Sequence, residues 1–222
     1  MDFFKIVWAI FAKDLRVEWR NREALASMCV FGLLVVFLFN FAFESAREET
    51  LRLLPALLWV TFAFSGILGF NRSFAAEREN ACLEGMALAP IDPSAIFVGK
   101  FLANLLFVGI AEVVIVFAAS LWYNFSFLPF LGRFSLIVFL GTLGYVALGT
   151  LFGAIAANTR MREVMLPVLQ FPVAFWVLIL AIDATSESLR GMGGNSGLLR
   201  VAGVSVVFAV ASFLLFEYVL EE

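Results

Sequence analysis

Two polar side chains lie inside a long apolar run, where a hydrogen-bonding or titrating group is costly. They are Asn104 and Glu112, between residues 93 and 122. A carboxylate surrounded by lipid is unfavourable unless it is protonated, paired or beside a wet cavity. Two interpretations of Glu112 therefore stay open: a functional intramembrane site, or a protonated acid that hydrogen-bonds a neighbouring helix.

The sequence lacks the motifs that carry most soluble-enzyme chemistry. It has no His, the commonest general base and a common haem-iron ligand. It has no GxxxxGK followed by Ser or Thr for nucleotide phosphates, no GxSxG and no CxxC. Cys29 and Cys82 are far apart and show no metal-ligand spacing, so neither a disulfide nor a metal site is expected. We expect a protein that is not an enzyme, binds no cofactor directly and receives its energy from elsewhere.

The composition is that of a membrane protein. Of its 222 residues, 63% are hydrophobic and 15% charged, whereas a soluble domain has about 45–50% apolar and about 25% charged residues. No basic patch suits nucleic acid beyond the N-terminal segment. The expected partners are therefore membrane lipid and other proteins.

Apolar runs long enough to cross a bilayer recur along the chain. They predict an all-α integral membrane protein with a single transmembrane domain, residues 1–222, and no room for a sizeable soluble domain. The six predicted spans lie at about 24–43, 51–70, 93–122, 133–157, 164–182 and 198–220.

The first residues predict an amphipathic helix, 3–22, that lies in the membrane interface before the spans. One face of its helical wheel carries Phe4, Val7, Trp8, Phe11, Leu15 and Trp19. The opposite face carries Lys5, Lys13, Arg16 and Arg20. We expect Trp19 at headgroup depth, with Lys13, Arg16 and Arg20 towards anionic lipid. The alternative is a helix whose first half is buried in the membrane domain.

The positions of Lys and Arg predict the orientation. Five of the 15 fall on one side, at Arg47, Arg52, Arg133, Arg190 and Arg200, and the other ten fall on or near the opposite side. The positive-inside rule then places both termini and the 71–94 and 158–163 loops in the cytosol.

A charged stretch, residues 71–100, separates the second and third spans. Within it, a helix-capable run ends at Pro90, and Asp92-Pro93 then offers a helix start with Asp as N-cap. The simplest interpretation is a solvated loop. The alternative is a docking element for a soluble partner, because the loop is long and carries its own helix signals.

Two spans carry packing signals. Gly149 and Gly153 have the GxxxG spacing that lets membrane helices approach closely. We interpret it as close packing within one chain, with a homodimer face as the alternative. Pro167 and Pro172 predict that the fifth span is kinked or broken.

Three segments carry a resemblance to a known family: Phe11–Leu25 (FAKDLRVEWRNREAL), 71–106 (with ERENACLEGMALAPIDPSAIFVGK) and Leu148–Ala181 (with GAIAANTRMREVMLP). The chain resembles the permease subunits of type-2 ABC exporters. Within these it is most similar to the haem exporter protein B family, the membrane B subunit of cytochrome c maturation. It departs at residues 80–84, Asn-Ala-Cys-Leu-Glu, where the family usually has Asp-Gly-Ser-Leu-Glu.

The resemblance implies a bacterial inner-membrane subunit that pairs with a cytosolic ATPase, the A subunit, and contacts a haem-handling C subunit. Haem would be a transported or delivered ligand, and ATP would act through the partner. A coupling helix at residues 77–90 would meet the ATPase through Glu77, Glu79, Leu83, Glu84, Met86 and Leu88. A permease for lipid, drug or polysaccharide, and a membrane scaffold that transports nothing, stay open as alternatives.

Overall fold

The computed structural model describes residues 3–42, 47–79, 92–157, 159, 161–191 and 194–221. Within these residues the chain forms seven α-helices, one short 3-10 helix and no strand, which confirms the all-α prediction. The elements are α1 (Phe3–Asn21), α2 (Glu23–Ala42), α3 (Arg47–Glu79), α5 (Pro93–Trp122), η1 (Leu128–Phe130), α6 (Leu131–Ala157), α7 (Arg162–Leu189) and α8 (Ser196–Glu221).

Six of these helices are long and apolar enough to cross a membrane, as predicted: α2, α3, α5, α6, α7 and α8. Two of them are longer than the sequence predicts. α3 continues past residue 70 to Glu79, because neither Pro nor Gly interrupts that segment. α7 continues past residue 182 and ends just before Gly191, whose φ of +71° suits glycine and stops a helix.

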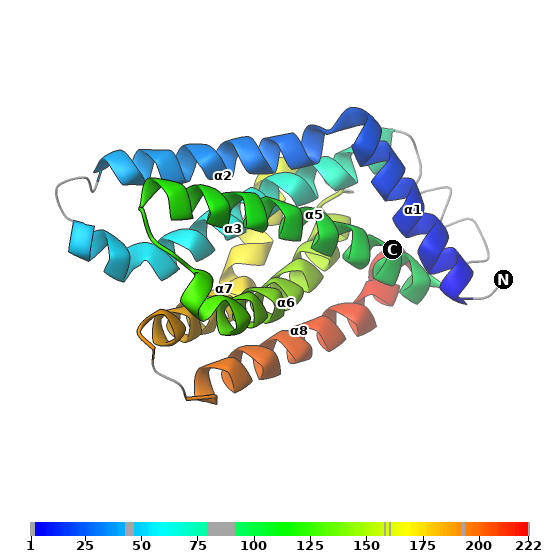
Figure 1. Ribbon diagram of the computed structural model, residues 1–222. Coiled ribbons are helices and arrows are strands. Elements are labelled where there is room, and N and C mark those ends of the chain that lie inside the picture. The colour runs from blue at the N-terminus through cyan, green and yellow to red at the C-terminus, as the bar shows by residue number, and fades with distance from the viewer. Residues whose placement is uncertain are drawn as a thin grey trace.

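Helix α6 lies at the centre of the bundle. It packs against α3, α5, α7 and α8, and Figure 1 shows it between α5 and α8. α3 and α6 are mostly buried, whereas most residues of α2, α7 and α8 are at least partly exposed. Such an outer surface is suited to lipid rather than water.

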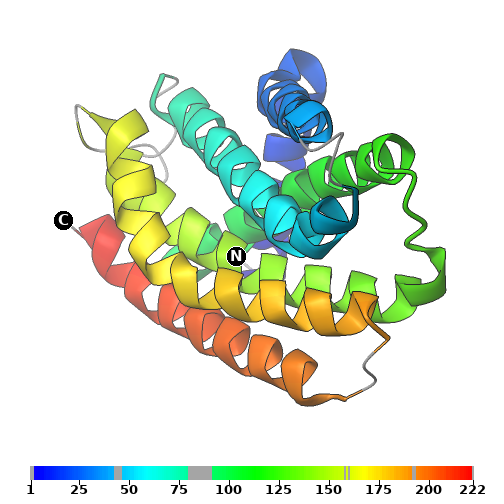
Figure 2. The same ribbon diagram turned by 90° about the vertical axis from the view of Figure 1, so that its left-hand side faces the viewer.

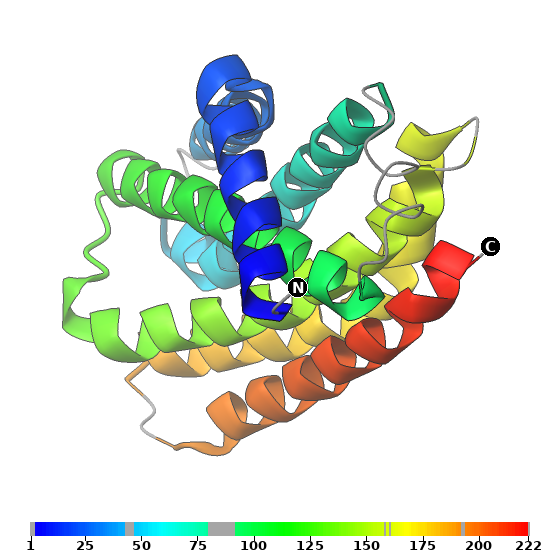
Figure 3. The same cartoon turned by 90° about the vertical axis from the view of Figure 1, so that its right-hand side faces the viewer.

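Helix α1 crosses one end of the bundle instead of running along it. It packs against the first turns of α5, which it passes in Figure 3. The beginning of α1, the beginning of α5 and the end of α8 all lie at the right-hand end in Figure 1. We call this end of the molecule the α1 end.

Helix α7 contains Pro167 and Pro172 and is one continuous helix, so of the two predicted alternatives, kinked or broken, it is not broken. Figure 2 shows it bending in its yellow first half, where the two prolines lie. Proline removes one backbone hydrogen bond and bends a helix. The rest of the helix continues because its neighbours α3, α6 and α8 pack along it.

The glycines of α6 allow close packing within the chain, which confirms the preferred interpretation of the GxxxG spacing. Gly149 faces the ring of Phe70, and Gly153 faces the ring of Phe74. Gly144 faces Ser205 of α8, where an added Cβ would lie 2.8 Å from the Ser205 Cα atom. Backbone cannot move aside as a flexible side chain can, so α6 and α8 need glycine there.

We predict that Gly144→Ala lowers the thermal stability of the purified protein, by about 1–3 kcal/mol, because the added methyl group forces α6 and α8 apart. The matched control is Gly203→Ala on α8, where an added Cβ meets nothing within 4 Å. This control should be neutral or slightly stabilising, since Ala favours a helix over Gly. Equal melting temperatures for both variants would contradict the close approach.

Candidate functional site

Helix α1 has three faces rather than two. Its buried face carries Val7, Ile10, Asp14 and Glu18. Phe4, Trp8 and Trp19 are exposed in the single chain, and Trp19 is 75% exposed, as expected of an aromatic residue at the membrane interface. Arg16 and Arg20 are exposed on the remaining face. The apolar face predicted from the helical wheel is therefore divided: Val7 packs on the protein, while its exposed members are available to lipid.

A buried ion pair joins α1 to α5. The Lys100 ammonium nitrogen lies 2.9 Å from Asp14 Oδ2, and the two side chains are only 1% and 8% exposed. The same nitrogen lies 5.5 Å from the centre of the Phe74 ring on α3, in a cation–π contact. We call Asp14, Phe74 and Lys100 the Lys100 cluster; it ties three helices together at the α1 end.

A second carboxylate fixes the corner between α1 and α2. Arg22 has a left-handed φ of +57° at this corner, and Glu18 Oε1 accepts a hydrogen bond from Leu25 N at 2.7 Å. That bond satisfies a free N–H group at the start of α2. On the adjoining surface, Arg72 of α3 lies 3.8 Å from the Glu23 carboxylate. The contacts of α1 with α5, through Asp14, and with α2, through Glu18, thus fix the direction of α1.

Only part of the predicted coupling element can be located. Glu77 and Glu79 belong to the last turns of α3, whose side chains there are not described. Leu83, Glu84, Met86 and Leu88 lie outside the described residues. The chain resumes at Asp92, which caps α5 by accepting a hydrogen bond from Ser94 N, as the Asp-Pro motif predicts.

The two intramembrane polar residues both hydrogen-bond to α6. Asn104 Nδ2 donates to Thr150 Oγ1 at 3.1 Å. Thr142 Oγ1 donates to Glu112 Oε1 at 2.6 Å, and Glu112 is 5% exposed. The structure thus supports the packed, hydrogen-bonded interpretation of Glu112, while leaving it at the edge of a groove.

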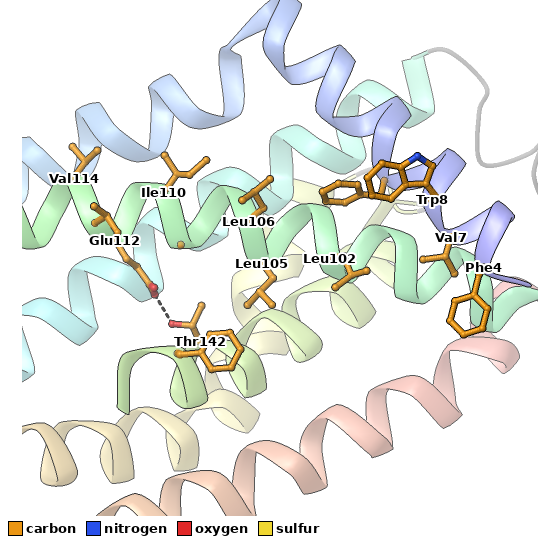
Figure 4. Close-up of a pocket in the computed structure, with 14 residues that line it drawn as sticks. Phe4, Val7, Trp8, Leu102, Leu105, Leu106, Ile110, Glu112, Val114 and Thr142 are labelled. Carbon is orange, nitrogen blue, oxygen red and sulfur yellow. Dashed lines mark hydrogen bonds between the residues drawn. The ribbon is translucent and has the colours of Figure 1, made fainter. Parts of the chain in front are cut away.

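This groove, of about 920 Å³, runs along α5 between α1 and α6. Figure 4 shows Phe4 and Trp8 at one end of it, and the Glu112–Thr142 hydrogen bond towards the other. Almost all of its lining is apolar, and Glu112 and Thr142 supply the polar atoms. No group of three or more metal-binding side chains occurs in the described part of the chain.

Sequence reasoning missed the partners of the Lys100 cluster. No role was predicted for Asp14, Glu18 or Lys100. A signal was present: these two acids lie four residues apart, on one face of a helix whose other faces are apolar and basic. A carboxylate pair beside apolar residues predicts a cationic partner, but wheel geometry cannot say which one.

In the part of the chain that the structure describes, seven α-helices, six of them long and apolar enough to span a membrane and one lying across an end, define a multi-pass helical membrane protein. The family model described as CcmB protein matches residues 5–218. The chain belongs to this family.

Three relatives share most of their length with this chain, and each is named Heme exporter protein B. The protein from Pseudomonas aeruginosa is 28% identical over 213 residues, 92% of this chain and 94% of its own. That from Rhodobacter capsulatus is 28% identical over 199 residues, covering 89% and 90%. That from Paracoccus denitrificans is 27% identical over 208 residues, covering 92% and 94%.

We predict that Asp14→Ala strongly destabilises the protein, by about 3–5 kcal/mol, because it removes the buried carboxylate that offsets the Lys100 charge. Lys13 provides the matched control, since it also pairs with Asp14, at 3.2 Å, but is 36% exposed. Solvent screens that pair, so Lys13→Met should cost about 1 kcal/mol or less. Thermal unfolding in detergent measures both variants, and similar losses would contradict the dominance of the buried pair.

Proposed function

We propose that this chain is the permease subunit of an ABC-type haem export or haem delivery complex that serves c-type cytochrome maturation. The observation that carries the haem assignment is the match over nearly the whole chain to proteins named Heme exporter protein B. A match over 92% of the chain leaves little room for a different membrane domain.

In this proposal the energy comes from a partner. A cytosolic ATPase, the A subunit, hydrolyses ATP, because this sequence has no phosphate-binding loop. A haem-handling C subunit receives the motion, and haem is the cargo. The chain has no His, a common ligand of haem iron, which supports a mechanical role for this subunit.

The protein lies in the bacterial inner membrane with the α1 end in the cytosol. Two observations support this orientation. The chain's basic residues are concentrated in the segments that would be cytosolic, as the positive-inside rule requires. Helix α1 begins and α8 ends at the same end of the bundle, as an even number of spans requires.

The coupling element is residues 77–90, which begin in the last turn of α3 and continue into the segment before α5. Its apolar anchors are Leu83, Met86 and Leu88, and its charged contacts are Glu77, Glu79 and Glu84. The Lys100 cluster supports this placement, because the helices on both sides of the segment contribute to it. Lys100 lies near the beginning of α5. Phe74 lies near the end of α3, and its ring contacts the Lys100 ammonium group. Force applied to residues 80–91 would therefore pass directly to α1 through Asp14.

The first test alters the docking contact. Leu83→Ala combined with Glu84→Lys should weaken ATPase binding, because a truncated interface anchor typically costs about 2 kcal/mol or more. The membrane bundle should stay folded, since neither side chain is needed to span lipid. Co-purification of the ATPase measures binding, and a melting curve of the membrane subunit alone checks its fold.

The matched control changes the other loop expected on the same side. Met161→Ala combined with Glu163→Lys alters the same kinds of residue, and both side chains are exposed. This variant should retain the ATPase. If both variants retained the ATPase and supported normal cytochrome c production, the coupling assignment would be wrong and residues 77–90 would be an ordinary solvated loop.

The second test separates force transmission from stability. Replacing both members of the buried pair, Asp14→Ala with Lys100→Met, removes both charges, and such a replacement is often neutral for stability. We expect the double variant to fold, to bind the ATPase and to permit ATP hydrolysis, but to lower cytochrome c production. Undiminished production would show that motion does not pass through this pair.

A further inference from the structure

Both acids of helix α1 face the protein. Asp14 and Glu18 are each only 8% exposed. Asp14 pairs with Lys100 of α5, and Glu18 accepts a hydrogen bond from Leu25 N of α2. Lys13, which was expected to face anionic lipid, lies 3.2 Å from Asp14 instead. Among the described residues of α1, all of the negative charge therefore lies on the side that packs against the bundle.

The opposite side of α1 is basic. Arg16 and Arg20 each lie two residues after one of these acids, which places them about 160° away from it around the helix. Both are exposed, and neither forms an ion pair with another described residue. In Figure 3 α1 crosses the front of the bundle, and no other described helix covers it. The side of α1 that faces outward thus carries only positive charge.

Exposed aromatic rings adjoin these arginines. Phe4, Trp8 and Trp19 are all exposed on α1. The interface of a bilayer offers lipid phosphates and apolar chains at neighbouring depths, so it can meet the arginines and the rings together. A soluble acidic protein would neutralise the arginines but would give no reason for three large exposed rings. We call Arg16, Arg20, Trp8 and Trp19 the outer face of α1.

The inner side of α1 determines whether Lys100 is buried. α1 is held to the bundle mainly by α5. At Gly99 of α5 an added Cβ would lie 3.1 Å from the Val7 carbonyl oxygen, so the two helices are close together there. If α1 moved away from α5, Asp14 would separate from Lys100 and solvent would reach the ammonium group. The position of α1 thus controls the exposure of Lys100.

We propose that anionic phospholipid headgroups bind the outer face of α1 and hold it against α5, so that the anionic-lipid content of the membrane controls the Asp14–Lys100 contact. Basic side chains near an anionic bilayer surface are attracted to it, and zwitterionic lipid lacks this attraction. The inference goes beyond the proposed function, because it concerns neither the cargo nor the ATPase.

The test measures how accessible Lys100 is in two kinds of vesicle. The full-length chain is reconstituted in phosphatidylcholine alone or with about one third phosphatidylglycerol, which carries the negative charge. Neither lipid has an amine, so a short treatment with acetic anhydride modifies the lysines of the protein. Mass spectrometry then gives the ratio of modified Lys100 to modified Lys5, which is exposed and serves as the reference. We expect this ratio to be about tenfold lower with phosphatidylglycerol, the effect expected of two basic residues near an anionic surface.

Two pairs of substitutions locate the effect. Arg16→Gln combined with Arg20→Gln should make the ratio equal in both vesicles. The matched control, Arg52→Gln combined with Arg190→Gln, removes two exposed arginines at the other end of the bundle and should keep the difference. Melting curves check that both variants are folded.

Salt provides a test that needs no variant. In about 1 M salt the screening length falls to about 3 Å, whereas buried pairs are screened much less. The difference between the two vesicles should therefore disappear for the unaltered chain, and this result decides even if the Arg16 and Arg20 variant does not fold.

Every other outcome overturns the proposal. Equal ratios for the unaltered chain in both vesicles would show that anionic lipid does not control the contact. A difference that persists in high salt or without Arg16 and Arg20 would place the lipid effect elsewhere. Loss of the difference in the control pair would make it an effect of net charge. The proposed function fails separately, through normal ATPase retention and cytochrome c production in the coupling variants.

Discussion

The buried contact between Asp14 and Lys100 fixes the arrangement at the α1 end. Burying the charge of Lys100 near the beginning of α5 is costly, and so is burying the carboxylate of Asp14 on α1. The cost is offset when the two charges pair with each other. Once they pair, α1 must cross the first turns of α5. Glu18 then holds the corner into α2, and Phe74 brings α3 to the same ammonium group.

The remaining bundle follows from how helices associate in lipid. Apolar burial gives little preference for one neighbour over another there, so close packing and hydrogen bonds decide. Gly144 lets α6 approach α8, Gly149 accommodates Phe70, and Thr142 and Thr150 hold polar groups of α5. The central position of α6 is the consequence: it carries small and hydroxylated residues on the sides that meet its neighbours.

Helix α5 connects the Lys100 cluster with the open groove. Its beginning carries Lys100 and adjoins the segment proposed to meet the ATPase, while its middle carries Gly109 and Glu112 beside the open groove. A rigid helix transmits displacement along its length. Motion received at one end of α5 would therefore be carried into the middle of the bundle.

The sequence by itself determined the class of fold. Apolar runs of spanning length, the Asp92-Pro93 helix start and the amphipathic first segment all depend on residues close together in the chain. Tertiary structure alone decided the partners: Asp14 with Lys100, Glu112 with Thr142, and Gly149 with Phe70. These pairs are far apart in sequence, and in a nearly uniform apolar chain, helix periodicity shows that a residue needs a neighbour but not which neighbour. The continuity of α7 through Pro167 and Pro172 has the same cause, since packing by α3, α6 and α8 supports a helix that local propensity would interrupt.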